Sequence, residues 1–129
     1  MGFLTGKTAI ITGAGRAVLK DGSCGSIGYG IATAYAKEGA NLVITGRNIK
    51  KLEAAKQELE SLYGIKVLTV QADVCAGGNN EATVANVVKQ AVDTFGGIQV
   101  LINNAQASAS GVPLTEHTTE QFDLAIYSG

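Results

Sequence analysis

The 129-residue sequence has few of the residue types that mark special classes of protein. It contains no tryptophan, one proline, one histidine and two cysteines, and aromatic residues make up 5% of the chain. Cys24 and Cys75 lack the spacing of a metal site, and a single pair of cysteines without a secretory signal favours reduced thiols. We therefore expect no metal site, and thiols kept reduced in the cytoplasm.

Charge of one sign and long apolar runs are also missing. Ten basic and eleven acidic residues give a formal net charge of −1, so no basic surface is expected to attract nucleic acid or an anionic membrane. No apolar run approaches the roughly 18 residues of a membrane helix. Residues 1–4 are too short for the apolar part of a secretory signal. The sequence predicts a soluble, cytoplasmic protein with no nucleic-acid or membrane partner.

Hydrophobic residues and glycine are abundant instead, at 46% and seventeen residues. A chain of this length forms about one domain, and this composition is typical of a globular α/β protein. Four short apolar runs, rich in β-branched residues, have the character of strands buried on both faces of a parallel sheet. They cover residues 8–12, 41–45, 65–70 and 98–102.

Helical patterns follow each of these strands. The first three helices begin near residues 27, 49 and 81 and stop at glycines, and a fourth opens near residue 119. Apolar residues at intervals of three and four predict the faces that meet the sheet. Helix by helix, these residues are Ile27, Ile31, Ala34 and Tyr35; Ile49, Leu52, Ala55, Leu59 and Leu62; and Val84, Val87, Val88, Ala91, Val92 and Phe95.

Strands that alternate with helices over short connections predict a Rossmann-type doubly wound parallel sheet, with helices on both faces. In such a sheet, ligands bind outside the carboxyl ends of the strands. The first strand ends in a glycine-rich stretch that contains Gly13, Gly15 and Gly28 before a helix begins. A strand, a glycine turn and a helix N-terminus together form a phosphate site. The alternative is that these are turn glycines without a ligand.

The end of the second strand predicts which nucleotide binds. NAD-binding sheets usually carry an acidic residue there for the adenosine ribose, whereas this chain has Arg47 followed by Asn48. A guanidinium offers a planar set of donors that suits a 2′-phosphate. The sequence therefore favours NADP over NAD. The alternative is that Arg47 is a solvated residue at the start of a helix.

Polar residues also follow the third and fourth strands. Asp73 can accept a hydrogen bond from an adenine amino group and Val74 can contact its ring, although an aspartate here is also a common turn former. Asn103 and Asn104 either tie the loops together or contact ribose. His117 lies in a polar stretch, where a solvated loop residue is the favoured interpretation.

Five motifs in this order resemble the short-chain dehydrogenase/reductase family. They are Thr12-Gly13, Ser26-Ile27-Gly28, Gly46-Arg47-Asn48, Asp73-Val74 and Asn103-Asn104-Ala105. Each motif is weak alone, and the set in register is specific. The resemblance implies an oxidoreductase with a nicotinamide cofactor, a small-molecule substrate and a homotetramer. The cofactor-binding residues it implies are Gly13, Gly15, Ser26, Ile27, Gly28, Arg47, Asn48, Asp73, Val74, Asn104 and Ala105.

Within the family, the sequence looks like the branch of bacterial NADP-dependent 12α-hydroxysteroid dehydrogenases, which act on bile acids. The family's catalytic Ser, Tyr and Lys would lie beyond Gly129, so residues 1–129 are expected to be the N-terminal, dinucleotide-binding part of one domain. No catalytic residue is assigned here. The alternatives are a ketoacyl or enoyl thioester reductase of the same family, and a non-catalytic module that senses NADP.

The sequence departs from the family pattern in three places. Twelve residues instead of three separate Gly13 from Ser26, which itself replaces a glycine. Gln106 stands where the family has glycine, and Gly129 falls where a catalytic asparagine is usual. We expect the insertion, from Arg16 to about residue 24, to project from the carboxyl edge of the sheet and to be poorly ordered without cofactor.

Overall fold

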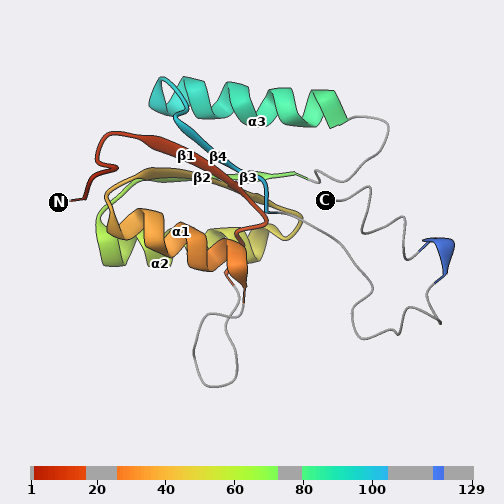
Figure 1. Ribbon diagram of the computed structural model, residues 1–129, viewed down its shortest axis with the longest axis horizontal. Coiled ribbons are helices and arrows are strands. Elements are labelled where there is room, and N and C mark those ends of the chain that lie inside the picture. The colour runs from red at the N-terminus through yellow and green to blue at the C-terminus, as the bar shows by residue number, and fades with distance from the viewer. Residues whose placement is uncertain (1, 17–25, 73–79, 105–117, 121–129) are drawn as a thin grey trace, which may run out of the picture.

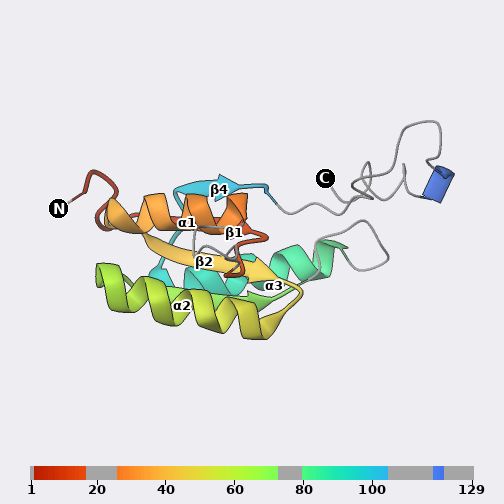
Figure 2. The same ribbon diagram turned by 90° about the horizontal axis from the view of Figure 1, so that it is seen from below.

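The structure is a computed structural model that describes residues 2–16, 26–72, 80–104 and 118–120. In these ranges a four-stranded parallel sheet lies between two layers of helices (Figures 1 and 2). The strand order is β3-β2-β1-β4, which confirms the predicted Rossmann-type arrangement. In chain order the elements are β1 (Thr8–Thr12), α1 (Ile27–Lys37), β2 (Asn41–Gly46), α2 (Ile49–Tyr63), β3 (Val67–Gln71), α3 (Asn80–Phe95) and β4 (Val100–Ile102).

The strand register brings the polar strand ends to one edge of the sheet. Thr12 at the end of β1 pairs with Thr45 of β2, and Ile11 pairs with Ile102 at the end of β4. Because parallel strands in register end together, the residues that follow β1, β2 and β4 emerge side by side. This carboxyl edge is where the sequence predicts the cofactor.

The sheet separates two hydrophobic cores. Helices α1 and α2 cover one face, and α3 lies on the other (Figure 1). The larger core, under α1 and α2, includes Ile11 and Ile44 from the sheet and Leu52 and Leu59 from α2, all fully buried. The smaller core, under α3, is formed by buried residues of three strands, of the position after β3 and of α3, namely Ile10, Val43, Val70, Ala72, Val87 and Ala91.

The predicted buried face of α1 is correct in part. Ile27 is 75% exposed, and the buried residues of the helix are Gly28, Tyr29, Ala32 and Ala36. Gly28, Ala32 and Ala36 recur every fourth residue on one side, and their small size lets the helix backbone approach the sheet closely. Of the other predicted residues, Ile31 and Tyr35 are partly buried and pack against the larger core, whereas Ala34 is exposed.

The other helices follow the prediction in their middle and depart from it at the edges. Leu52, Ala55 and Leu59 of α2 are buried, whereas Leu62 near its end is 64% exposed. On α3, the predicted stripe is split: its sheet-facing residues are buried and its outer valines, Val84, Val88 and Val92, are exposed. No helix of the described ranges is both long enough and apolar enough to cross a membrane.

Two strands begin later than predicted. Strand β3 starts at Val67, opposite Leu42, because residues 65 and 66 return the chain from α2 to the sheet after Gly64, which has a left-handed φ of 69°. Strand β4 starts at Val100. The preceding Gln99 is held by its N–H, 3.0 Å from the carbonyl oxygen of Thr8, and by its side-chain Oε1, which accepts from the Thr8 N–H at 2.7 Å.

Candidate functional site

The turn after β1 is anchored to the end of β2. The N–H groups of Gly13 and Ala14 both donate to the carbonyl oxygen of Thr45, at 2.8 and 3.2 Å. Gly13 has a φ of 70°, a conformation that a residue with a side chain rarely adopts. The turn therefore leaves the sheet in a direction that depends on glycine at this position.

Helix α1 starts in contact with this turn. A Cβ added at Gly28 would overlap the carbonyl oxygen of Gly13 and lie 2.6 Å from Nδ2 of Asn104. Asn104 Nδ2 donates to the carbonyl oxygens of Thr12, at 3.0 Å, and Gly13, at 3.3 Å, while its N–H donates to Thr12 Oγ1 at 3.0 Å. The ends of β1 and β4 and the start of α1 thus meet at one tightly packed junction.

The first turn of α1 offers free hydrogen-bond donors at this junction. Ser26 caps the helix, with its Oγ accepting from the Tyr29 N–H at 3.2 Å. Within the described ranges, the N–H groups of Ile27 and Gly28 have no acceptor. A helix N-terminus with unused N–H groups carries partial positive charge and suits a phosphate. The exposed Ile27 side chain adds an apolar contact beside it.

The start of α2 lies at the neighbouring strand end. Asn48 caps α2, and its Oδ1 accepts from the Lys51 N–H at 3.2 Å, so this oxygen is already engaged. Arg47 is exposed, and its carbonyl oxygen accepts from Gln71 Nε2 at 3.1 Å. This bond fixes the backbone at Arg47. The guanidinium is left on the surface at the carboxyl edge, where an anionic group can reach it.

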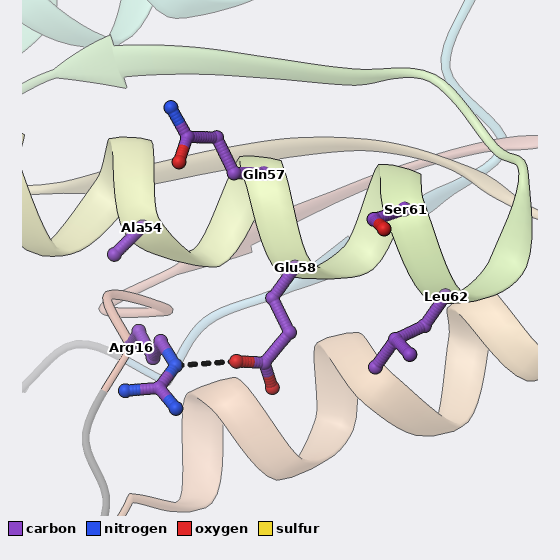
Figure 3. Close-up of a pocket in the computed structure, with 6 residues that line it drawn as sticks. All are labelled: Arg16, Ala54, Gln57, Glu58, Ser61 and Leu62. Carbon is purple, nitrogen blue, oxygen red and sulfur yellow. Dashed lines mark hydrogen bonds and ion pairs between the residues drawn. The ribbon is translucent and has the colours of Figure 1, made fainter.

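Arg16 and Tyr29 meet on one carboxylate that the sequence did not single out. Arg16 Nε lies 2.5 Å from Glu58 Oε2 on α2 (Figure 3). The Tyr29 hydroxyl donates to Glu58 Oε1. These two donors hold the pKa of Glu58 below its ordinary value, the Tyr29 bond being the larger cause. Hydrogen bonding to Glu58 raises the pKa of Arg16, and burial together with Glu58 raises that of Tyr29.

A surface hollow of about 540 Å³ adjoins this carboxylate. It is lined by Arg16 and by one side of α2, where Ala54, Gln57, Ser61 and Leu62 lie at helical spacing around Glu58 (Figure 3). It runs along α2 toward the end of that helix, so its far part lies away from the carboxyl edge. We therefore place the candidate cofactor site at the junction of Gly13, Gly28 and Asn104 and not in this hollow.

The predicted site residues fall into three groups. Gly13, Ser26, Ile27, Gly28 and Asn104 come together at the junction. Gly15, Arg47 and Asn48 lie beside it; a Cβ at Gly15 would meet Lys51 Cβ at 3.0 Å, so the chain passes close to α2 there. Asp73, Val74 and Ala105 lie outside the described residues, as do Gln106, His117 and nearly all of the insertion. The described ranges contain no cluster of potential metal ligands.

The sequence interpretation missed Glu58 because its position looks like a solvated one. It belongs to the charged residues of α2, and its half-buried setting arises only when α1 packs alongside. Asn104 was predicted either to tie loops together or to contact ribose, and the structure shows the tie. Whether it also contacts a cofactor stays a prediction.

Comparison with known proteins places this geometry in a family. The family model described as short chain dehydrogenase matches residues 7–127. A 12alpha-hydroxysteroid dehydrogenase from Clostridium sp. (strain ATCC 29733 / VPI C48-50) is 59% identical over all 129 residues, which correspond to 47% of its own length. The chain thus spans about half the length of this curated relative.

Solved structures agree on the fold. An alcohol dehydrogenase from Thermococcus sibiricus, complexed with 5-hydroxy-NADP, has a TM-score of 0.75 and 30% identity, with 95% of this chain and 46% of that one covered. An NAD⁺-bound xylitol dehydrogenase has a TM-score of 0.80 and 26% identity, covering 98% and 43%. The matched sequence and the shared fold lead to the same conclusion: the chain belongs to the short-chain dehydrogenase family.

Proposed function

We propose that these 129 residues are the NADP-binding part of an oxidoreductase that interconverts a secondary alcohol and a ketone. The observation that carries the proposal is the junction at the carboxyl edge, where the open N-terminus of α1 packs on the glycine turn after β1. The N–H groups of Ile27 and Gly28, which have no acceptor among the described residues, fit a phosphate, and the nearby Arg47 fits the extra phosphate of NADP. When bound, NADP supplies or accepts the hydride.

In this proposal, the glycine turn and the first turn of α1 hold the pyrophosphate. Gly13 and Gly15 carry no side chain that would block the pyrophosphate, and Ser26, Ile27 and Gly28 contribute the helix end. The negative charge of the pyrophosphate is favoured there by the partial positive charge of the helix N-terminus. The backbone at these positions, and no catalytic side chain, does the binding.

The two ends of the dinucleotide would lie on either side of the pyrophosphate. Arg47 and Asn48 face the adenosine ribose and its 2′-phosphate, with Asp73 and Val74 at the adenine. Asn104 and Ala105, on the other side, lie toward the nicotinamide half. Asp73, Val74 and Ala105 are proposed from the sequence motifs, because they lie outside the described residues.

The choice of NADP over NAD rests on Arg47. The structural relatives include proteins with an NADP derivative and with NAD⁺, so the fold alone is compatible with either. Arg47 is exposed at the end of β2, with its backbone fixed by Gln71. A guanidinium can form two parallel hydrogen bonds to a phosphate, and a carboxylate at this position would repel one.

Calorimetric titration of the full-length protein with NADP and NAD tests the cofactor. We expect Arg47→Asp to weaken NADP binding about ten- to a hundredfold, as for the loss of charge-assisted hydrogen bonds, and to leave NAD binding nearly unchanged. Lys50→Asp makes the same charge change at an exposed position three residues on and should alter NADP affinity less than about threefold. Equal affinities for both nucleotides, or equal effects of both variants, would rule out the role of Arg47.

We further propose a hydroxysteroid substrate, a bile acid with a 12α-hydroxyl group. The support is the 59% identity to a 12alpha-hydroxysteroid dehydrogenase over the whole chain. The full-length protein should oxidise cholate with NADP, which is followed through NADPH absorbance. Chenodeoxycholate, which lacks the 12-hydroxyl group, should give no such increase in absorbance. Activity on acyl thioesters and none on cholate would point instead to a thioester reductase of the same family.

The catalytic part is proposed to lie beyond Gly129, in the same domain of a cytoplasmic homotetramer. Proton transfer to the substrate oxygen needs a tuned group within hydrogen-bond reach. Sequencing past Gly129 should therefore find a Tyr followed four residues later by a Lys. Without that pair, the protein would be a module that binds NADP without catalysis. Sedimentation of the full-length protein tests the tetramer.

A further inference from the structure

One carboxylate contacts both ends of the connection between β1 and α1. Arg16 is the last described residue before residues 17–25, and Tyr29 lies in the first turn of α1 after them. Glu58 Oε2 binds Arg16 Nε (Figure 3). Glu58 Oε1 accepts a hydrogen bond from the Tyr29 hydroxyl. Arg16 is further tied to α2 by its N–H, 2.9 Å from the carbonyl oxygen of Lys51.

The two contacts differ in their exposure to water. Tyr29 is 4% exposed, whereas the side chains of Arg16 and Glu58 are 35% and 32% exposed. The Arg16 ion pair is therefore partly screened by solvent, and the Tyr29 bond is the better protected of the two. Together they occupy both oxygens of one side chain on a helix that is itself well packed on the sheet.

We propose that Glu58 is a positioning residue that clamps the two ends of this connection together. The entropic cost of holding the ends of a loop together grows with the logarithm of its length, and twelve residues here separate Gly13 from Ser26. A fixed point on α2 that binds both ends offsets part of that cost. It keeps the glycine turn and the start of α1 in register despite the long connection.

The consequence concerns nucleotide binding, and this step rests on the proposed function. The N-terminus of α1 and the Gly13 turn would bind the same pyrophosphate, so their relative position sets the affinity. Glu58 contacts neither surface of that site directly. It acts through Arg16 and Tyr29. Substitution of Glu58 should therefore change the affinity for NADP without a comparable change in kcat.

Substitutions of Glu58 in the full-length protein test the clamp. We expect Glu58→Ala to raise the Kd for NADP about tenfold, and Glu58→Gln, which can still accept from Tyr29, about threefold, while kcat changes less than twofold. Glu53→Ala is the matched control, because Glu53 lies on the same helix and binds only the exposed Thr69 hydroxyl, at 2.6 Å, among the described residues. It should change the Kd less than twofold.

A second measurement needs no nucleotide. Lys20 lies between the two anchored ends, so tryptic cleavage after it reports on how firmly they are held. Cleavage of the cofactor-free protein should be at least threefold faster in Glu58→Ala than in the wild type or Glu53→Ala. A Lys20→Gln variant identifies the fragment. Faster cleavage in a protein that binds no NADP would support the clamp and overturn the proposed cofactor.

The two arms of the clamp should also be interdependent. Arg16→Ala and Tyr29→Phe each remove one contact, and either loss releases one end. The double variant should then exceed the more severe single variant by less than twofold in Kd and in cleavage rate. Fully multiplicative effects, or a Glu58→Ala variant that behaves like Glu53→Ala in both measurements, would overturn the proposal.

Discussion

The two faces of the sheet differ in how completely the described helices cover them. On the α1/α2 face, two helices lie side by side and the core residues Ile44, Leu52 and Leu59 have no exposed surface (Figure 2). On the other face, α3 packs over β2 and β3, and Leu101 of β4 is 56% exposed. The outer valines of α3, Val84, Val88 and Val92, are 41% to 50% exposed.

This difference shows which core supports the candidate site. One helix is too narrow to cover a four-stranded sheet, whereas two helices can bury a continuous stripe of it. The junction of Gly13, Gly28 and Asn104 and the clamp at Glu58 involve α1 and α2. Their geometry is therefore supported by a complete core, and the α3 face is supported by a partial one.

The largest expected effect tests the completeness of the α1/α2 core. Leu59→Ala should lower the free energy of unfolding by about 2–5 kcal/mol, because it leaves a cavity at a position with no exposure. Leu62→Ala, the same change three residues later at a 64% exposed position, should cost less than about 1 kcal/mol. Urea denaturation of both variants gives the comparison, which fails if the two costs are equal.

The tight junction predicts that substitution of Gly28 has a smaller effect on stability and a large effect on NADP binding. Gly28→Ala forces a methyl group onto the Gly13 carbonyl oxygen and Asn104, so it should cost about 1–3 kcal/mol of stability. It should also abolish measurable NADP binding, since α1 must move away from the glycine turn. Gly6→Ala is the control. An added Cβ there has no atom within 4 Å, but the φ of 82° is unfavourable for alanine, so this variant introduces backbone strain without a clash. Retained NADP affinity in Gly28→Ala would contradict the packing.

Two adjacent valines on α3 test the open face. Val87 is 5% exposed, and Val87→Thr should lower the free energy of unfolding by about 1–2 kcal/mol, because it buries a hydroxyl group at an apolar position that offers it no hydrogen-bond partner. Val88→Thr, at 41% exposure, should change stability by less than about 0.5 kcal/mol. An equal loss in the full-length protein would show that other parts of that protein bury Val88, and the contrast between the faces would then disappear.

Thr45 gives a prediction of opposite sign. By alternation with Val43 its side chain lies on the α3 face, and its buried Oγ1 has no hydrogen-bond partner in the described structure. Thr45→Val keeps the shape and removes the unpaired group, so thermal unfolding should show a gain of about 1 kcal/mol. A loss would mean that the hydroxyl has a partner in the full-length protein.

The smallest effect is the pH dependence of the clamp. The folded state holds the pKa of Glu58 below its ordinary value of 4.5, so the clamp stabilises the protein above that pH and loses its contribution as the pH falls through the lowered pKa. The stability difference between wild type and Glu58→Gln should thus be constant from pH 7 to 5 and shrink below 4.5. A difference that grows in acid would contradict the direction of the shift.

The order of elements could be predicted from the sequence because it depends on local patterns. An apolar run such as Thr8–Thr12 indicates a buried strand, and a glycine such as Gly64 indicates the end of a helix, without reference to any other part of the chain. They determined the parallel sheet and the edge where glycines and Arg47 gather, which is the edge of the proposed nucleotide site. The motifs at the strand ends then indicated the family.

The tertiary structure decided what depends on two segments meeting. The centre of the buried side of α1 follows from how closely Gly28 and Ala32 let the helix approach its neighbours, whereas apolar spacing found only the partly buried Ile31 and Tyr35 at its margin. Glu58 looks like one charged residue among several on α2. It becomes a shared partner of Arg16 and Tyr29 only because α1 and the turn after β1 pack beside it, since a hydrogen bond between distant residues leaves no periodic trace in either segment.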